Sequence, residues 1–147
     1  MVPIEEFALA PGENRLDREI LTEITIPQQG KSSGAAFKKL KRSSADLAKV
    51  SCAVRIMIKD GQCKDIRIVL GAVADKVFRA GGAEEVMRGE KVTDAVVDEA
   101  GEKASQEAQP ITDVRSTAKY REQMIGVLVQ RMIRLSIERA KALSSAI

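Results

Sequence analysis

VSCAVRIMIKDGQCKDIRIVLG, residues 50–71, carries the strongest structural signal in this 147-residue chain. Its apolar residues recur at every second position in two runs, which is the period of a strand that buries one face. Asp60-Gly61, between the runs, is a turn signal of the hairpin type. The sequence therefore predicts a β-hairpin with these residues on its buried face: Cys52, Val54, Ile56, Ile58, Ile66, Ile68 and Leu70.

Two further strands are expected before the hairpin. Residues 19–26 carry isoleucines with period two, and Pro27 ends the run. After a polar turn, residues 35–40 resume as a second strand, and a short helical turn is expected at 46–48. Residues 3–19 are rich in proline and glycine and show no helical period, so we expect an irregular leader there.

Three helices are expected after the hairpin. The first covers 83–88 and ends at Gly89, the second covers 93–109 with Thr93 as its cap, and the third runs from 116 to about 143. The third has a wide apolar face, which must be covered by the sheet and the other helices or by another subunit. Strands followed by helices predict an α+β domain, with a three- to four-stranded antiparallel sheet packed against about three helices.

Composition excludes several classes of function. The net charge of +3 is too small to indicate a nucleic-acid partner. The chain has no histidine, and its two cysteines alone cannot assemble a zinc or iron–sulfur site, so we expect no metal site. A disulfide between Cys52 and Cys63 is geometrically possible in a hairpin, but we expect reduced, buried thiols. No segment is long and apolar enough to span a bilayer, and no secretion signal is present, so we expect a cytoplasmic protein.

The charged and glycine-rich stretches leave alternatives open. Lys38 and the three cations that follow it, Lys39, Lys41 and Arg42, suit a solvated edge strand or a phosphate contact; nucleic-acid binding is disfavoured because no aromatics are interleaved. The glycines at 71–74 and 81–82 match no phosphate-binding loop.

Asp113 is expected to pair with Arg115 or Arg121 in a structural role. The surplus of acids at 84–107 and of bases at 115–141 favours antiparallel packing of the last two helices.

The order of several segments resembles one known family, the flavoprotein (medium) subunits of carbon monoxide dehydrogenases and xanthine dehydrogenases, which are molybdenum hydroxylases. The beginning of the chain resembles the closing segment of their FAD-binding region, and the remainder resembles their C-terminal domain. The segments that carry this resemblance are VPIEEF (2–7), PG (11–12), EILTEITIP (19–27), AFKKLKRSSADLAKV (36–50), IVLGAVA (68–74) and DVRSTAKYR (113–121).

The resemblance implies a role in a larger enzyme. Residues 1–33 would be the tail of an absent FAD-binding domain, and residues 34–147 would close over the isoalloxazine of a shared FAD. Leu21, Lys38, Asp46 and Leu47 would lie at this cofactor, although some relatives carry an aromatic residue where this chain has Leu47. The implied partners are the N-terminal FAD-binding domain and the iron–sulfur and molybdopterin subunits, with electrons passing from the clusters through FAD to an acceptor.

Other functions remain open on the residues themselves. The chain, which has no catalytic residues of its own in this interpretation, could instead be a structural or interaction module that binds no flavin. A homo-oligomer through the long C-terminal helix is a further possibility.

Overall fold

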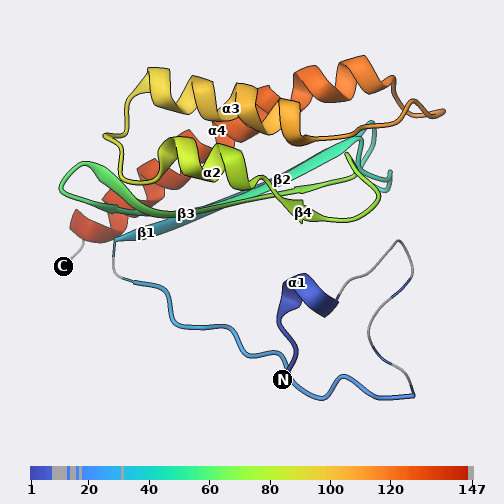
Figure 1. Cartoon of the computed structure of the whole chain (residues 1–147), viewed down its shortest axis with the longest axis horizontal. Coiled ribbons are helices and arrows are strands. Elements are labelled where there is room, and N and C mark those ends of the chain that lie inside the picture. The colour runs from blue at the N-terminus through green and yellow to red at the C-terminus, as the bar shows by residue number, and fades with distance from the viewer. Residues whose placement is uncertain (8–12, 14–15, 17, 31, 146–147) are drawn as a thin grey trace.

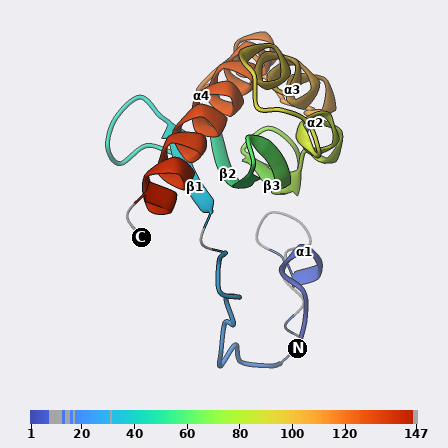
Figure 2. The ribbon, with the colours of Figure 1, turned by 90° about the vertical axis from the view of Figure 1, so that its left-hand side faces the viewer.

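The structure is a computed structural model that describes residues 1–7, 13, 16, 18–30 and 32–145. It forms two layers, with the long helices on one face of an antiparallel sheet of order β1-β2-β3-β4 (Figures 1 and 2). The predicted α+β class is confirmed. The elements in chain order are α1 (Ile4–Phe7), β1 (Ser33–Leu40), β2 (Val50–Lys59), β3 (Gln62–Gly71), β4 (Phe78–Arg79), α2 (Gly81–Met87), α3 (Asp94–Glu107) and α4 (Ala118–Ser145).

The predicted hairpin is the centre of the sheet. β2 and β3 pair antiparallel, with a register shift between Met57 and Ile58. Asp60 and Gly61 at the turn have φ values of 53° and 74°, in the left-handed region that two-residue hairpin turns require. The hairpin prediction is confirmed, and its turn chemistry agrees with the observed backbone.

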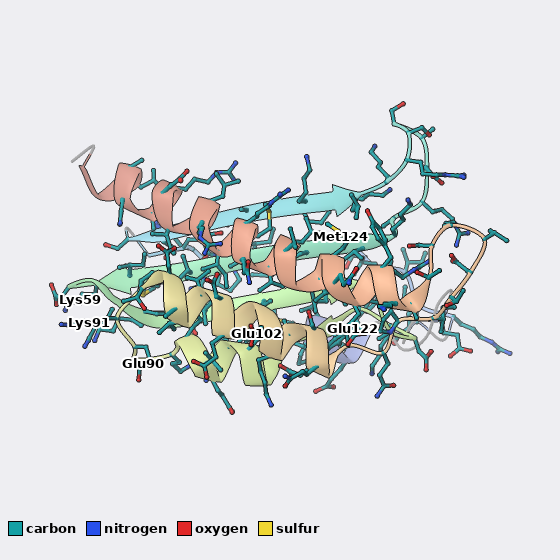
Figure 3. The ribbon with its side chains drawn as sticks, turned by 90° about the horizontal axis from the view of Figure 1, so that it is seen from above. Lys59, Glu90, Lys91, Glu102, Glu122 and Met124 are labelled. Atoms are coloured by element: carbon teal, nitrogen blue, oxygen red, sulfur yellow. The ribbon has the colours of Figure 1, made fainter. Side chains whose placement is uncertain are left out.

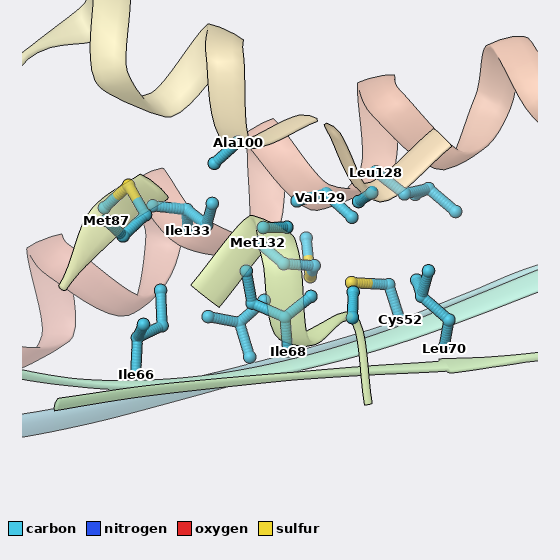
Figure 4. Close-up of a cluster of buried hydrophobic side chains, with 14 of the residues drawn as sticks. Cys52, Ile66, Ile68, Leu70, Met87, Ala100, Leu128, Val129, Met132 and Ile133 are labelled. Atoms are coloured by element: carbon cyan, nitrogen blue, oxygen red, sulfur yellow. The ribbon is translucent and has the colours of Figure 1, made fainter. Parts of the chain in front are cut away.

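The core lies between this sheet and the helices and is built from aliphatic side chains. Alternate residues of β2 and β3 point into it and meet the buried side of α4, as Figure 4 shows for Ile68, Leu70 and Val129. At about 25 cal/mol per Å² of apolar surface removed from water, such burial is the main stabilising contribution. The largest fully buried aliphatic side chains are Ile56, Ile66, Ile68, Leu70, Met87, Ile125 and Ile133.

Both thiols belong to this core and are free. Cys52 pairs with Leu70 and Cys63 with Ile58, so the two cysteines lie about six residues apart along the hairpin, roughly 20 Å at 3.3 Å per residue. The expectation of reduced, buried thiols is confirmed. The idea that they could form a cross-strand disulfide is wrong, because the register separates them far beyond bonding distance.

The apolar face of α4 is covered within the chain itself. It packs on β1 and β2, where the Ser136 hydroxyl donates to the Val54 carbonyl at 3.2 Å. Gly34 allows this approach, since a Cβ there would lie 2.0 Å from the Ser136 carbonyl oxygen. The sheet and α3 therefore cover most of the apolar face of the long helix. A homo-oligomer through this helix stays a prediction. Among the described helices, none is both long and apolar enough to cross a membrane.

The last two helices pack antiparallel, as their opposite charges predict. Arg134 of α4 contacts Asp94 at 3.2 Å and Asp98 at 2.7 Å, both at the beginning of α3. At the other end of the pair, the Ser105 hydroxyl donates to the Glu122 carbonyl at 3.0 Å. Figure 3 shows the two helices side by side from above, with Glu102 on α3 and Glu122 on α4.

A buried carboxylate joins the edge of the sheet to α2. Glu84 is 1% exposed and accepts a hydrogen bond from the Ile68 backbone N–H at 2.9 Å. Its carboxylate also bonds Arg79 of β4 and lies 3.5 Å from Arg88. The pKa of Arg79 is raised, chiefly by its hydrogen bond to Glu84. Because a buried charge is costly without partners, this cluster of ion pairs fixes α2 against the sheet.

Three local predictions need correction. Residues 19–26 form no strand: their isoleucines are exposed, because no described strand lies beside them to pair. The helical turn expected at 46–48 is absent, and the chain turns at 44–45 instead. The leader contains a short helix, α1, and the sheet gains a two-residue strand, β4, neither of which has a periodic sequence signal.

Candidate functional site

The connection between β1 and β2, residues 41–49, forms an exposed loop at one end of the sheet (Figure 1). The Lys49 N–H donates to the Leu40 carbonyl at 2.8 Å and closes the loop where the two strands begin to pair. The Lys49 ammonium lies 5.5 Å from the centre of the Tyr120 ring. This cation–π contact ties the loop to the first turn of α4.

The tip of the loop is held by Asp46. One carboxylate oxygen accepts the Leu47 backbone N–H at 2.8 Å, and the other accepts Arg42 Nε at 3.0 Å. The hydrogen bond from Arg42 is the main reason that the pKa of Asp46 is lowered. Leu47 itself is 61% exposed, so its side chain is presented to the outside on a fixed main chain. The structure therefore places the predicted site residues Asp46 and Leu47 together, with Asp46 in a positioning role.

Lys38 lies on the strand that leads into this loop. It pairs with Cys52, so its side chain leaves the sheet on the same side as the helices. Unlike its neighbour on that face, Ala36, it is exposed. β1 is an edge strand, as predicted for this lysine-rich segment.

Leu21 is in a different part of the molecule. It belongs to the N-terminal segment, which lies below the sheet on the side opposite the long helices (Figures 1 and 2). Its side chain is 50% exposed. Lys38 lies two residues before the end of β1, and Asp46 and Leu47 lie in the loop that follows this strand. The grouping of Leu21, Lys38, Asp46 and Leu47 at one cofactor stays a prediction.

Asp113 organises the turn before α4. It accepts the backbone N–H groups of Arg115 and Ser116, and its carboxylate lies 2.7 Å from the Arg115 guanidinium and 2.6 Å from the largely buried Arg121. The pKa of Asp113 lies well below its usual range. The main cause is the hydrogen bond from the Arg115 backbone N–H, and the second is the hydrogen bond from the Arg121 side chain. The predicted structural role is confirmed, and both arginines contribute to it.

The N-termini of α2, α3 and α4 are capped by side chains of the chain itself. Glu107 accepts the N–H groups of Gly82 and Ala83, the first turn of α2, at 3.1 and 2.8 Å. Thr93 accepts the Val96 N–H of α3, and Thr117 accepts the Tyr120 N–H of α4. A cofactor diphosphate would have to displace these caps, because the same N–H groups are what anions bind at helix ends.

The described residues contain no group of three or more side chains able to hold a metal ion. Two shallow hollows lie on the surface of the described residues, and neither of these two is lined by Leu21, Lys38, Asp46 or Leu47. Both lie at the open face of the sheet and the edge of β1, around Ala35, Arg55 and Arg139.

Sequence reasoning missed several residues that shape these surfaces. Arg42 was grouped with the neighbouring lysines, although its spacing of four from Asp46 is the signal of a local ion pair. Glu107 has no local signal for its capping of α2, because the two are 24 or more residues apart. The arginines of the open face, Arg55 and Arg67, are adjacent only through strand register.

Comparison with known protein families gives a match over more than half of the chain. Residues 35–135 match the family model of the CO dehydrogenase flavoprotein C-terminal domain. The carbon monoxide dehydrogenase medium chain of Hydrogenophaga pseudoflava is 34% identical over 134 residues, which are 90% of this chain and 46% of that relative. The medium chain from Afipia carboxidovorans is 36% identical over 135 residues, 92% of this chain and 43% of that relative.

Solved structures agree with these sequence matches. The carbon monoxide dehydrogenase of H. pseudoflava superposes with a TM-score of 0.90 at 33% identity, over 94% of this chain and 48% of the matched chain. The reconstituted CO dehydrogenase of Oligotropha carboxidovorans gives a TM-score of 0.85 at 30% identity, over 91% and 47%. The chain therefore spans somewhat less than half the length of the relatives that it matches.

Proposed function

The chain belongs to the CO dehydrogenase flavoprotein C-terminal domain family, and from this membership we propose that it forms the wall that closes over FAD in a molybdenum hydroxylase-type oxidoreductase. The observation that carries the proposal is the loop 41–49, which presents Leu47 on a main chain fixed by Asp46. The matched region, residues 35–135, contains this loop and Lys38.

The residues of this end of the sheet suit a flavin neighbour. Leu47 offers an exposed apolar side chain that would exclude water from one face of the isoalloxazine, and Asp46 keeps it in place. Lys38 offers a cation that would favour the anionic reduced form of the flavin. When bound, FAD would supply the electron transfer from iron–sulfur clusters to an acceptor, and this chain would supply position and electrostatics.

The diphosphate of FAD is assigned to other polypeptide. The first turns of α2, α3 and α4 are already capped by Glu107, Thr93 and Thr117, which a diphosphate at these helix ends would have to displace. FAD would thus be shared with an N-terminal FAD-binding domain, and this chain would hold it only weakly alone. Iron–sulfur and molybdopterin subunits would complete the enzyme.

Residues 1–33 fit the role of a tail of that FAD-binding domain. Ile20, Ile24 and Ile26 are between 72% and 85% exposed, although their period of two is that of a strand with one apolar side. A sheet on the preceding polypeptide would bury them and would bring Leu21 toward the cofactor. The C-terminal domain would then be residues 34–147.

The test measures flavin retention with and without the other half of a related medium chain. The part of the H. pseudoflava medium chain that lies outside the match is joined before Met1, and flavin absorbance per polypeptide is compared with that of the chain alone. We expect flavin in the fusion and little in the isolated chain. Stoichiometric, tightly held FAD in the isolated chain would contradict the shared site, and a colourless fusion would favour an interaction module without flavin.

Variants of the fusion locate the site. Leu47→Asp should weaken FAD binding about tenfold or more, because about 1.4 kcal/mol of apolar contact corresponds to one factor of ten. Leu47→Phe should retain the flavin. Lys38→Gln should lower the flavin reduction potential, whereas Lys103→Gln, at an exposed position of α3, should leave it unchanged. Equal effects of the two lysine variants would remove Lys38 from the site.

A further inference from the structure

The loop between β1 and β2 is braced by its own polar groups. The Asp46 carboxylate accepts hydrogen bonds from the Arg42 side chain and from the Leu47 N–H. Lys41 donates from Nζ to the Ser44 carbonyl. Each of these bonds begins and ends inside the loop. Because a segment held by internal bonds moves cooperatively, we expect residues 41–47 to move as one unit about the two ends of the loop.

The two ends of the loop are fixed by the sheet. Leu40, the last residue of β1, pairs with Val50, the first residue of β2, and Val50 is fully buried. The Lys49 N–H donates to the Leu40 carbonyl at 2.8 Å. These contacts fix where the loop begins and ends. They leave its angle to the sheet free, since the terminal residues of a loop can absorb changes in φ and ψ.

One side-chain contact joins this loop to the helix layer. The Lys49 ammonium lies 5.5 Å from the centre of the Tyr120 ring, in the first turn of α4. In the part of the chain that the structure describes, no hydrogen bond or ion pair of residues 41–48 reaches outside the loop. The contact between Lys49 and Tyr120 is therefore the polar contact that can hold the loop at one angle.

Tyr120 is itself firmly placed. Its N–H donates to the Thr117 hydroxyl at 3.2 Å. The next residue, Arg121, is largely buried and bonds two other segments, the Ala72 carbonyl at 2.8 Å and the Asp113 carboxylate at 2.6 Å. Since the first turn of α4 is anchored on both sides, the Tyr120 ring gives the loop a fixed point.

We infer that Tyr120 is a positioning residue, which sets the angle of the loop through Lys49 and thereby sets where the exposed Leu47 side chain lies. The beginning of α4 and the loop lie at the same end of the sheet (Figures 1 and 3). The consequence for a cofactor rests on the proposed function, in which Leu47 covers the flavin. Tyr120 would act on the flavin only through the loop.

Hydrogen exchange followed by NMR in the 147-residue chain tests this tether without flavin. Tyr120→Leu removes the aromatic face, so the Lys49 amide that closes the loop should lose about two- to fivefold of its protection, the worth of an exposed cation–π contact. Tyr120→Phe should keep the protection of the parent chain, because it keeps a ring face and the Tyr120 hydroxyl bonds to none of the described residues. Tyr120 is 40% exposed, so neither replacement opens a cavity in the core.

Two further variants separate the contact from a general effect on the helix. Lys119→Gln removes an exposed cation from the same turn of α4 and should leave the protection of the Lys49 amide unchanged. Lys49→Gln should lower this protection as Tyr120→Leu does. The double variant should lose no more than either single one, because both remove the same contact. Additive losses would show that the two side chains act separately, and they would overturn the inference.

The fusion with the other half of a medium chain tests the consequence. Tyr120→Leu should weaken FAD binding by up to about fivefold, since the loop would spend less time in the competent position. It should also change the fluorescence of the bound flavin, whereas Tyr120→Phe and Lys119→Gln should leave both properties unchanged.

The outcomes separate this inference from the proposed function. Unchanged protection of the Lys49 amide in Tyr120→Leu overturns the inference, whatever the fusion binds. Lost protection in Tyr120→Leu with unaltered flavin binding and fluorescence in a flavin-containing fusion also overturns it. A colourless parent fusion removes the proposed function, and the exchange measurements on the chain then decide whether Tyr120 holds the loop.

Discussion

Replacing Gly34 by alanine should destabilise the domain by about 3 to 4 kcal/mol. A Cβ at this position would lie 2.0 Å from the carbonyl oxygen of Ser136 and 2.5 Å from the amide nitrogen of Ala140. Both are backbone atoms of α4, so no rotation of a side chain relieves the clash. Because Cβ contacts below 3.0 Å do not occur, α4 must move away from β1 by about 1 Å or more.

The size of the expected loss of stability follows from this movement of α4. A gap of about 1 Å removes a quarter to a half of the dispersion energy of the atoms that face it, and strain of this kind in a packed core costs about 1 to 3 kcal/mol. The hydrogen bond from the Ser136 hydroxyl to the Val54 carbonyl would also be lost, at about 1 kcal/mol. Together the strain and the lost hydrogen bond give the expected loss of stability. The value lies near the upper end of this range because the atoms in the way belong to the backbone of α4 and cannot rotate aside.

Equilibrium unfolding in urea, followed by circular dichroism, measures the effect. Gly126→Ala is the matched control within α4, since its Cβ would meet the Ser105 hydroxyl at 3.1 Å and alanine favours a helix by about 1 kcal/mol. We expect the control to stay within about 1 kcal/mol of the parent chain. A loss below about 1 kcal/mol for Gly34→Ala, at an unchanged denaturant slope, would refute the close approach of α4 to β1.

Three further results are expected. Asp46→Ala should speed hydrogen exchange at the Leu47 amide about fivefold, since one net hydrogen bond is worth about 1 kcal/mol; an unchanged rate in exchange mass spectrometry would show that the loop is held by other contacts. Glu84→Ala should cost about 3 to 5 kcal/mol in urea unfolding, against about 0.5 or less for the exposed Glu85→Ala, and similar losses would contradict the buried ion-pair cluster. Burial raises the pKa of Cys52 to about 12 from 9.0, so the unfolded chain releases this proton at lower pH than the folded chain does. The free energy of unfolding should therefore fall above pH 9 by up to about 1.4 kcal/mol per pH unit. A Cys52→Ala variant whose stability falls equally steeply with alkaline pH would disprove this assignment.

Much of the fold could be predicted because its signals are local. The hairpin is encoded by period-two alternation around Asp60-Gly61, and α3 by its Thr93 cap, so their predictions were correct to within a few residues. The same reasoning failed at 19–26, where the pattern of a strand is present without a neighbour to complete it. A periodic pattern indicates which face a segment would bury, and the burial itself needs a second surface.

Some features of the candidate site could be predicted from the sequence, and others depend on the fold. The nearness of Asp46 to Leu47 is fixed by sequence, and the family resemblance identifies the loop that carries them. That Asp46 holds the Leu47 main chain and bonds Arg42 was decided by the turn of the loop. The position of Lys38 depends on the register of β1 with β2.

The α+β class, the hairpin, three helices and the lack of histidine chemistry could be read from the residues alone, because composition and periodicity are properties of the chain. Tertiary packing set which face of the sheet lies away from the helices, how closely α4 approaches β1 at Gly34, and which arginines line the hollow beside Ala35. These outcomes join residues far apart in sequence, such as Ala35 and Arg139, and no local pattern encodes such a contact.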